Sequence, residues 1–343
     1  MPRPDYSVVI PIDRPEKTVK SVESLLGLPA GERPRDIFLC VGRNPSLQRN
    51  LGLSLCRSPL VYFLDEDSWV IPGTTARLAA QFQQERTAAV GGPNLPYPDA
   101  SPFEKTASAV LASWMGSFSV RTRYASIGSV KEATEKDLIL CNMMVSRRIF
   151  QEVRGFRPNL YPNEENEFLN RLLHSGYQLV YDPAAAVYRP RRKNAREFCW
   201  QSFRYGRGRA RQMKVYPCLS DLVHLVPFGF VLYILSLFLP LFFQPGQPAW
   251  AGWLASQWWR GPLYLFLLLA FGTGLSVASW FRQPMDLIGV PLLIFLRQFS
   301  YGIGLFTGLL LPLPQPSKEP IRLFKVSGKA GKYRFVPVPA PKP

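Results

Sequence analysis

Three carboxylates follow an unbroken apolar run in the stretch VYFLDED, from Val61 to Asp67. Such a run is typical of a strand buried on both faces of a parallel α/β sheet. Because open α/β sheets bind ligands beyond the carboxyl ends of their strands, we expect Asp65 and Asp67 at a ligand site. Carboxylates this close together repel unless a cation or a proton offsets them, and Mg²⁺ or Mn²⁺ is commonly held by one or two carboxylates together with substrate phosphates. The alternative is a solvated acidic turn.

A second acidic group opens the stretch PNEENEFLNRLLHS, from Pro162 to Ser175. Its apolar residues recur at helical spacing, which predicts an amphipathic helix. Glu164 and Glu165 fall in the first turn of that helix, where the helix dipole favours negative charge. Position alone therefore explains these acids, and a catalytic role needs further support.

A dense basic run with interleaved aromatic residues extends from Arg189 to Lys214. Glycines at 206 and 208 predict a bent or mobile segment there. Arginine side chains pair well with phosphate oxygens, so the run suits a clamp on a diphosphate. It equally suits the basic belt that flanks membrane helices on the cytoplasmic side. A nucleic-acid patch is the least favoured interpretation, because membrane segments follow directly.

The elements that must position these residues are strands and helices in alternation. Apolar runs predict strands over Tyr6–Ile12, Asp36–Val41, the stretch from Val61, Ala88–Gly92 and Leu138–Val145. A helix follows each of the first three strands, and the second of these helices begins with Asn44 as its cap and Pro45 at its first position. Strand-then-helix units predict an α/β fold with a doubly wound, mostly parallel sheet.

Composition bounds the function further. The chain has 343 residues and a formal net charge of +17, which suits phosphate-rich ligands or an anionic membrane surface. Its five cysteines show no C-x-x-C spacing and only two histidines are present, which argues against a zinc site, a disulfide framework or a histidine-built metal centre.

Charges almost vanish between residues 219 and 312, where three segments are long enough to cross a bilayer: Leu222–Phe243, Leu263–Phe281 and Leu287–Leu311. Arg297, inside the third segment, must face protein, water or a lipid head group. We therefore expect a cytosolic domain over residues 1–215, a membrane region over 216–314 with two to three hydrophobic helices, and a basic, Pro-containing tail over 315–343. This organisation predicts a multi-pass protein of the inner (cytoplasmic) membrane, with the number of crossings open.

Four motifs in order, SVVIP, FLDEDS, NEENEF and QSFRYGRGRA, resemble those of family 2 glycosyltransferases over roughly residues 6 to 215. The resemblance implies the A-type glycosyltransferase fold, a Rossmann-like mixed α/β domain, here followed by a C-terminal α-helical membrane region. It implies that Asp65 and Asp67 ligate a divalent cation, Mn²⁺ or Mg²⁺, that bridges the phosphates of a nucleotide sugar. Glu165, or Glu164 before it, would be the base that takes the proton from the acceptor hydroxyl.

The resemblance also implies ligand contacts. Gln201, Arg204 and Tyr205 resemble the Q-x-x-R-W motif of processive members with Tyr in place of Trp, which weakens the case for polymerisation. The residues implied to bind the nucleotide or its diphosphate are Asp13, Asn44, Gln48, Asn50, Asp65, Gln201, Arg204, Arg207 and Arg209. Where the family often has an acidic D-G-S-type turn, this chain has VGRNPSLQRN, so the base of the donor stays open.

Taken together, the sequence predicts a membrane-anchored, metal-dependent, inverting glycosyltransferase. It would act on a nucleotide-sugar donor and on a lipid-linked or membrane-proximal hydroxyl acceptor, in polysaccharide or glycolipid assembly, with membrane lipids and no nucleic acid as partners. The alternatives are a processive polysaccharide synthase and a catalytically silent membrane scaffold of the same fold.

Overall fold

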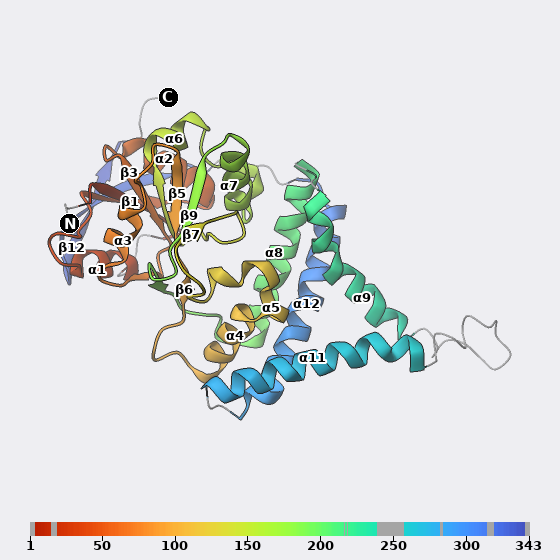
Figure 1. Ribbon diagram of the computed structural model, residues 1–343. Helices are drawn as coiled ribbons and strands as arrows, with labels where there is room; N and C mark the ends of the chain where they lie inside the picture. The colour runs from red at the N-terminus through yellow and green to blue at the C-terminus, as the bar shows by residue number, and fades with distance from the viewer. Residues whose placement is uncertain are drawn as a thin grey trace. The chain divides into compact units, whose positions relative to one another are not determined.

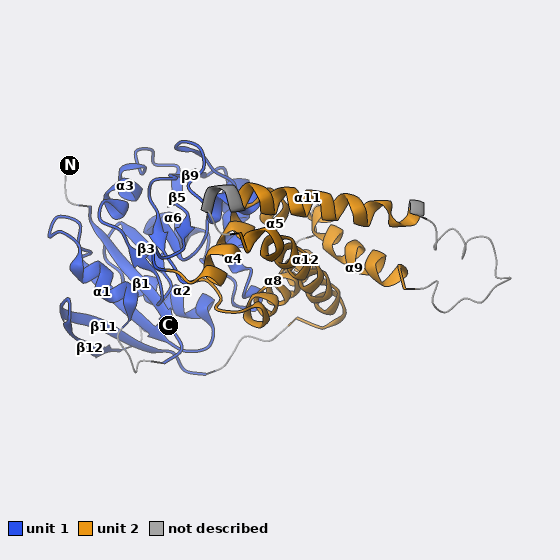
Figure 2. Cartoon of the chain, turned by 90° about the horizontal axis from the view of Figure 1, so that it is seen from below, with its two compact units in different colours: residues 1–99, 119–190, 314–343 blue, residues 100–118, 191–313 orange. Residues whose placement is uncertain are grey.

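The computed structural model (Figure 1) describes residues 4–14, 19–215, 217, 219–238, 257–281, 284–313 and 319–339. The chain divides into two compact units, each made of segments that are distant in sequence (Figure 2). Unit 1 comprises residues 1–99, 119–190 and 314–343, and unit 2 comprises residues 100–118 and 191–313.

Unit 1 is built on a nine-stranded sheet of order β12-β11-β2-β1-β3-β8-β5-β9-β7. Its strands are β1 (Tyr6–Ile12), β2 (Asp36–Val41), β3 (Leu60–Leu64), β5 (Thr87–Gly91), β7 (Lys131–Glu132), β8 (Asn142–Ser146), β9 (Gln178–Tyr181), β11 (Arg322–Lys329) and β12 (Lys332–Val338). Strand β1 pairs in parallel with β2 and β3, whereas β8 runs antiparallel between β3 and β5. The predicted Rossmann-like mixed α/β sheet is thus confirmed.

Helices cover both faces of this sheet because its central strands are apolar on both sides. Along β1, Val9 packs with α2 (Pro45–Leu55), α6 (Arg147–Glu152) and α7 (Glu164–His174). Its neighbours Val8 and Ile10 pack instead with α1 (Lys20–Gly27) and α3 (Thr74–Ala80). This alternation is the period-2 geometry of a strand, and it gives unit 1 two apolar layers, one on each side of the sheet.

Helix α2 begins as predicted, because the Asn44 side chain accepts a hydrogen bond from the Leu47 amide and Pro45 occupies the first helical position. It lies very close to the sheet. A Cβ atom on Gly52 would come within 2.4 Å of Val9, so only glycine permits this approach. The close packing fixes the face of α2 that carries Arg49.

A second, three-stranded sheet of order β4-β10-β6 lies in unit 1. It consists of β4 (Trp69–Val70), β6 (Asn94–Leu95) and β10 (Val187–Tyr188). Because β4 follows directly after the acidic turn, this small sheet links that turn to the residues that follow β10.

The segment predicted as a basic tail contains regular structure. Residues 322–338 form the hairpin of β11 and β12, and β11 pairs antiparallel with β2 at the edge of the large sheet. Leu323 is buried in the core, and the Tyr333 hydroxyl accepts a hydrogen bond from the amide of Val19.

Unit 2 is helical. It contains α4 (Pro102–Ala112), α5 (Trp114–Ser117), α8 (Ala195–Val215), η3 (Leu219–Leu225), α9 (Val226–Ser236), α11 (Gln257–Phe281) and α12 (Asp286–Leu310). The 3₁₀ segment η1 (Phe118–Arg123) leads from unit 2 back into unit 1.

Glycines bring α8 and α12 into backbone contact. A Cβ atom on Gly206 would lie 2.1 Å from the carbonyl oxygen of Tyr301, and one on Gly304 would lie 2.1 Å from that of Phe203. The prediction that Gly206 and Gly208 bend or loosen their segment is therefore wrong: α8 is one continuous helix of 21 residues, and Gly206 serves close packing.

Two described helices are long and apolar enough to cross a membrane, at Trp259–Val277 within α11 and at Asp286–Leu310. The first predicted segment contributes the shorter helix α9, and its residues 239–243 lie outside the described part of the chain. Arg297 faces protein, since it donates hydrogen bonds to the carbonyl oxygen of Gly116 and to the hydroxyl of Ser117.

Candidate active site

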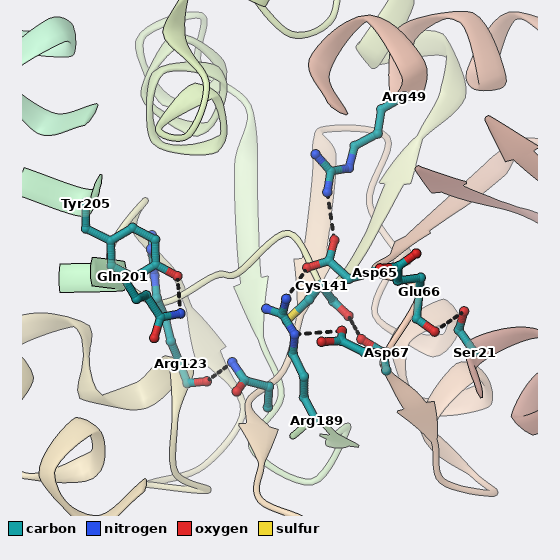
Figure 3. Close-up of polar contacts among 12 residues, drawn as sticks. Ser21, Arg49, Asp65, Glu66, Asp67, Arg123, Cys141, Arg189, Gln201 and Tyr205 are labelled. Carbon is teal, nitrogen blue, oxygen red and sulfur yellow. Dashed lines mark hydrogen bonds and ion pairs between the residues drawn. The ribbon is translucent and has the colours of Figure 1, made fainter. Parts of the chain in front are cut away.

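The acidic turn lies where the sequence places it, at the carboxyl end of the central strand β3 (Figure 3). The turn is closed by a hydrogen bond from the Ser68 amide to the Asp65 carbonyl oxygen. The Glu66 carbonyl oxygen accepts a further hydrogen bond from the amide of Ser21, just inside α1. These bonds close the turn after β3 and tie it to the start of α1.

Arg189 bridges the two aspartates. Its Nη2 lies 2.9 Å from Asp65 Oδ2, and its Nε lies 2.9 Å from Asp67 Oδ1 (Figure 3). The small sheet explains this position. Tyr188 of β10 pairs with Trp69 of β4, so the residue after Tyr188 lies opposite the residues that precede Trp69. The Arg189 amide also donates to the Leu95 carbonyl oxygen of β6.

Arg49 joins the acidic turn to the second acidic group. Its Nη2 lies 2.8 Å from Asp65 Oδ1, and its Nη1 lies 3.1 Å from Glu164 Oε1. Both Arg49 and Glu164 are buried. Buried charges are tolerated when they are paired, and breaking such a pair strongly destabilises the protein. Asp65 thus holds two guanidinium groups, one on each carboxylate oxygen.

Glu165 has an arginine partner of its own. Arg123 Nη1 lies 3.2 Å from Glu165 Oε1, and Arg123 Nη2 donates to Asn166 Oδ1 over 2.6 Å. The two glutamates differ in access, because the side chain of Glu165 is 18% exposed and that of Glu164 only 2%. Among the described residues, Glu164 Oε2 is buried without a hydrogen-bond partner.

Burial sets the protonation of these acids. Desolvation raises the pKa of Glu164 to about 7, although the nearby Arg49 opposes the shift. The pKa of Glu165 is also raised by burial, against the opposing charge of Arg123. The pKa of Glu66 is raised by burial and then by the neighbouring carboxylates of Asp67, Asp65 and Asp13, so Asp13 at the end of β1 adds to the same negative field. Clustered carboxyl groups with raised pKa values are typical of acid–base sites.

A family model described as "Glycosyl transferase family group 2" matches residues 60–296, more than half of the chain. The chain belongs to this family. The matched region contains the acidic turn, the glutamate pair and the helices of unit 2 as far as Leu296 in α12, so it includes most of the candidate site.

Solved structures agree in fold. A mannosyltransferase, PcManGT from Pyrobaculum calidifontis, in complex with GDP-Man and Mn²⁺, is similar with a TM-score of 0.50 and 13% identity, over 84% of this chain and 86% of that one. At this identity the likeness shows the fold alone.

Two other structures match over smaller parts. GalNAc-T7 with UDP, GalNAc and Mn²⁺ has a TM-score of 0.38 and 13% identity over 54% of this chain, and TarS 1–349 of S. aureus has a TM-score of 0.38 and 13% identity over 60%. This chain spans 43% of the length of the first and 65% of the second. A search of curated protein sequences finds no match.

Within this group 2 glycosyltransferase, three residues implied as nucleotide contacts form hydrogen bonds to the backbone of unit 1. Asn44 caps α2 and donates to the Pro158 carbonyl oxygen. Gln48 donates to the carbonyl oxygens of Ile12 and Cys40, and Asn50 pairs with both the amide and the carbonyl oxygen of Phe156. All three side chains therefore already have hydrogen-bond partners within unit 1.

The remaining implied contacts lie on α8 in unit 2. Gln201 Nε2 donates to the Tyr205 hydroxyl over 3.1 Å, and Arg207 stacks over the Phe203 ring. Arg209 is largely buried, where its Nη1 donates to Gln212 Oε1 and lies 3.9 Å from Asp221. It therefore has partners inside unit 2. Arg204 and Arg207 are partly exposed on the same helix.

Two arginines of the site went unrecognised in the sequence, Arg123 and Arg189. Arg189 appears there only as the first residue of the basic run, and Arg123 lies in a polar stretch that resembles a loop. The available signal was electrostatic: a cluster of buried carboxylates requires cations, and Arg123 and Arg189 supply two of them beside Arg49.

The chemistry of the donor set fits a divalent cation. Asp65 and Asp67 offer hard carboxylate oxygens from one turn, and such sites are completed by substrate phosphates. Among the described residues no group of three or more His, Cys, Asp or Glu side chains is arranged to hold a metal ion. The guanidinium of Arg189 lies on oxygens of both aspartates.

Proposed function

We propose that this group 2 glycosyltransferase moves a sugar from a nucleotide-sugar donor to a hydroxyl group of a lipid-linked or membrane-proximal acceptor, with inversion at the anomeric carbon. The observation that carries the proposal is one ion-paired network in unit 1. It connects Asp65 and Asp67 at the end of β3, through Arg49, to Glu164 at the start of α7. PcManGT, which shares the fold, was solved with GDP-Man and Mn²⁺, and this supports a nucleotide sugar as the donor class.

On the donor side, we assign Asp65 and Asp67 to a divalent cation, Mn²⁺ or Mg²⁺. When bound, such an ion neutralises charge on the departing diphosphate and acts as a Lewis acid on the leaving group. Asp13 is assigned to the nucleotide, and Arg204 and Arg207 of α8 remain our proposed contacts for the diphosphate, since arginine forks match phosphate oxygens.

On the acceptor side, we assign the general base to Glu165. The acceptor oxygen attacks the anomeric carbon, the bond from that carbon to the diphosphate oxygen breaks, and the hydroxyl proton passes to the Glu165 carboxylate. Glu165 is the more accessible of the two glutamates. Arg123 pairs with its carboxylate, and Asn166 holds Arg123 in place by accepting a hydrogen bond from it. Glu164 is the positioning residue, because it is buried and fixed through Arg49.

We propose that unit 2 anchors the protein to the cytoplasmic membrane. The apolar stretch within α11 is mostly exposed, with large side chains such as Leu265, Leu268 and Leu275 on its surface. Exposed apolar surface of this extent requires lipid or a partner. Synthesis of a polysaccharide or a glycolipid, with a membrane-borne acceptor, is consistent with that anchoring.

The test uses the full chain in detergent, calorimetry with UDP, GDP and dTDP in the presence of Mn²⁺, and transfer assays with the sugar nucleotides of whichever base binds. We expect one diphosphate to bind, Asp65→Asn to abolish that binding, and Glu165→Gln to retain it while losing transfer. The exposed Glu85→Gln is the matched control. If none of the three nucleotides binds to a folded protein, the proposed function is wrong and a scaffold role takes its place.

A further inference from the structure

The guanidinium of Arg189 pairs with both aspartates of the acidic turn. One guanidinium contacts Asp65 Oδ2 and Asp67 Oδ1, each at 2.9 Å, and so pairs with both carboxylates that we assign to a metal (Figure 3). The other arginine at this turn, Arg49, contacts the second carboxylate oxygen of Asp65, Oδ1. Arg189 thus pairs with the two carboxylates that would hold a divalent cation.

The two arginines are held in different ways. Arg49 projects from the middle of α2, is buried, and is tied to Glu164 as well as to Asp65. Arg189 follows the two-residue strand β10, its side chain is 22% exposed, and it is the second-last residue of the segment 119–190 of unit 1. Breaking a buried ion pair costs more than breaking a partly exposed one, so of the two guanidinium groups that of Arg189 is the easier to displace.

We propose that Arg189 is an internal competitor of the divalent cation: its guanidinium occupies Asp65 and Asp67 until a diphosphate offers it a new anionic partner. This inference rests on the proposed function and adds that the binding of the metal ion depends on the binding of the nucleotide. A divalent cation placed on the two aspartates beside Arg189 meets like-charge repulsion, whereas a diphosphate supplies negative charge for both cations at once. Metal and nucleotide should therefore bind cooperatively, each tightening the other by the same factor.

The experiment measures Mn²⁺ binding directly, from the loss of the free Mn²⁺ signal in electron paramagnetic resonance, with no turnover involved. Wild type is compared with Arg189→Gln, which removes the competing charge, and with Arg189→Lys, which keeps it. The matched control is Arg148→Gln, an exposed arginine on α6 that pairs with Glu152. Each protein is titrated with Mn²⁺ alone and with Mn²⁺ in the presence of UDP or GDP, corrected by the same titration without protein.

With Mn²⁺ alone, we expect Arg189→Gln to bind about tenfold more tightly than wild type, as follows if Arg189 covers the site in nine of ten molecules. Arg189→Lys and Arg148→Gln should stay close to wild type. The nucleotide should tighten Mn²⁺ binding strongly in wild type and weakly in Arg189→Gln.

The inference is overturned if Arg189→Gln binds Mn²⁺ no more tightly than wild type while Asp65→Asn still abolishes binding. It is also overturned if the variant keeps its fold, by circular dichroism, and binds no Mn²⁺ at all. Failure of the proposed function has a different signature, namely that UDP, GDP and dTDP all fail to bind wild type whatever Arg189 does.

Discussion

At the scale of single residues, the two glutamates at the start of α7 should separate in kinetics. Glu165→Gln removes the proposed base, so we expect kcat to fall by about 10²- to 10⁴-fold with donor binding nearly unchanged. Glu164→Gln retains an acceptor for Arg49 and should cost much less. Isothermal calorimetry and initial rates on both variants make the comparison, and a larger loss of kcat in Glu164→Gln would reverse the assignment.

Burial of Glu164 also predicts a pH dependence of stability. Its pKa is raised to about 7 from an ordinary value of 4.5, so the folded protein binds more protons than the unfolded chain between these values. The free energy of unfolding should therefore fall as pH rises from about 5 to about 7, and the stabilisation should be complete only below the unfolded pKa.

Denaturant titrations of wild type and Glu164→Gln at several pH values measure this effect. In the variant, the free energy of unfolding should fall clearly less steeply with pH than in wild type. An identical slope in the variant would assign the effect to another group, for which Glu165, whose pKa is also raised by burial, is the nearest candidate.

The sequence singled out the acids of the candidate site but not Arg123 and Arg189 beside them, for a physical reason. Asp65 and Asp67 share one turn, and Glu164 and Glu165 share one helical turn, so local pattern identifies each pair. Arg189 reaches Asp67 only through the pairing of β10 with β4, a contact between segments more than a hundred positions apart. No local pattern encodes such a pairing.

At the scale of elements, the glycines between α8 and α12 should be sensitive to any side chain. Gly304→Val places atoms against the Phe203 carbonyl oxygen and forces the helices apart, so we expect a loss of at least about 1–3 kcal/mol. Gly272→Val in α11 is the matched control, because nothing lies within 4 Å of its Cβ position. Thermal unfolding in detergent compares the two, and equal midpoints would contradict close packing at Gly304.

The same helices show the limit of propensity as evidence. Two glycines within the basic run suggest a loose segment when that run is considered alone. Against α12, Gly206 allows a backbone approach that no other residue permits, and packing gained along the helix outweighs the local cost. Likewise, the antiparallel direction of β8 could not be predicted, because an apolar run does not show in which direction its strand runs. The parallel pairing of β1 with β2 and β3 follows from the helices between these strands.

At the scale of the whole molecule, the C-terminal hairpin should be part of the folding unit of unit 1. A chain that ends at residue 313 loses the buried Leu323 and exposes the edge of β2. We expect the free energy of unfolding of unit 1 to fall by at least about 2 kcal/mol, the cost of losing one buried leucine side chain.

The control for this truncation is a chain lacking only residues 340–343, which lie outside the described part of the structure. Proteolysis rates and unfolding midpoints of the two chains decide the outcome. Equal stability of both would show that the hairpin only rests on the sheet. Sequence alone did not predict this hairpin, because the Lys and Pro residues of the stretch 315–343 resemble a solvated tail, and its strand character depends on the β2 edge that it covers.

The pairing of β11 with β2 also bears on how the protein is made. Strand β2 leaves the ribosome early, whereas its partner emerges only after all of unit 2 has been synthesised. During that interval an apolar strand edge is available to the wrong partner, and contacts of such long range form slowly. The newly made chain thus depends on β11 and β12 to close the sheet, and a chain whose synthesis ends within α12 would keep that edge open.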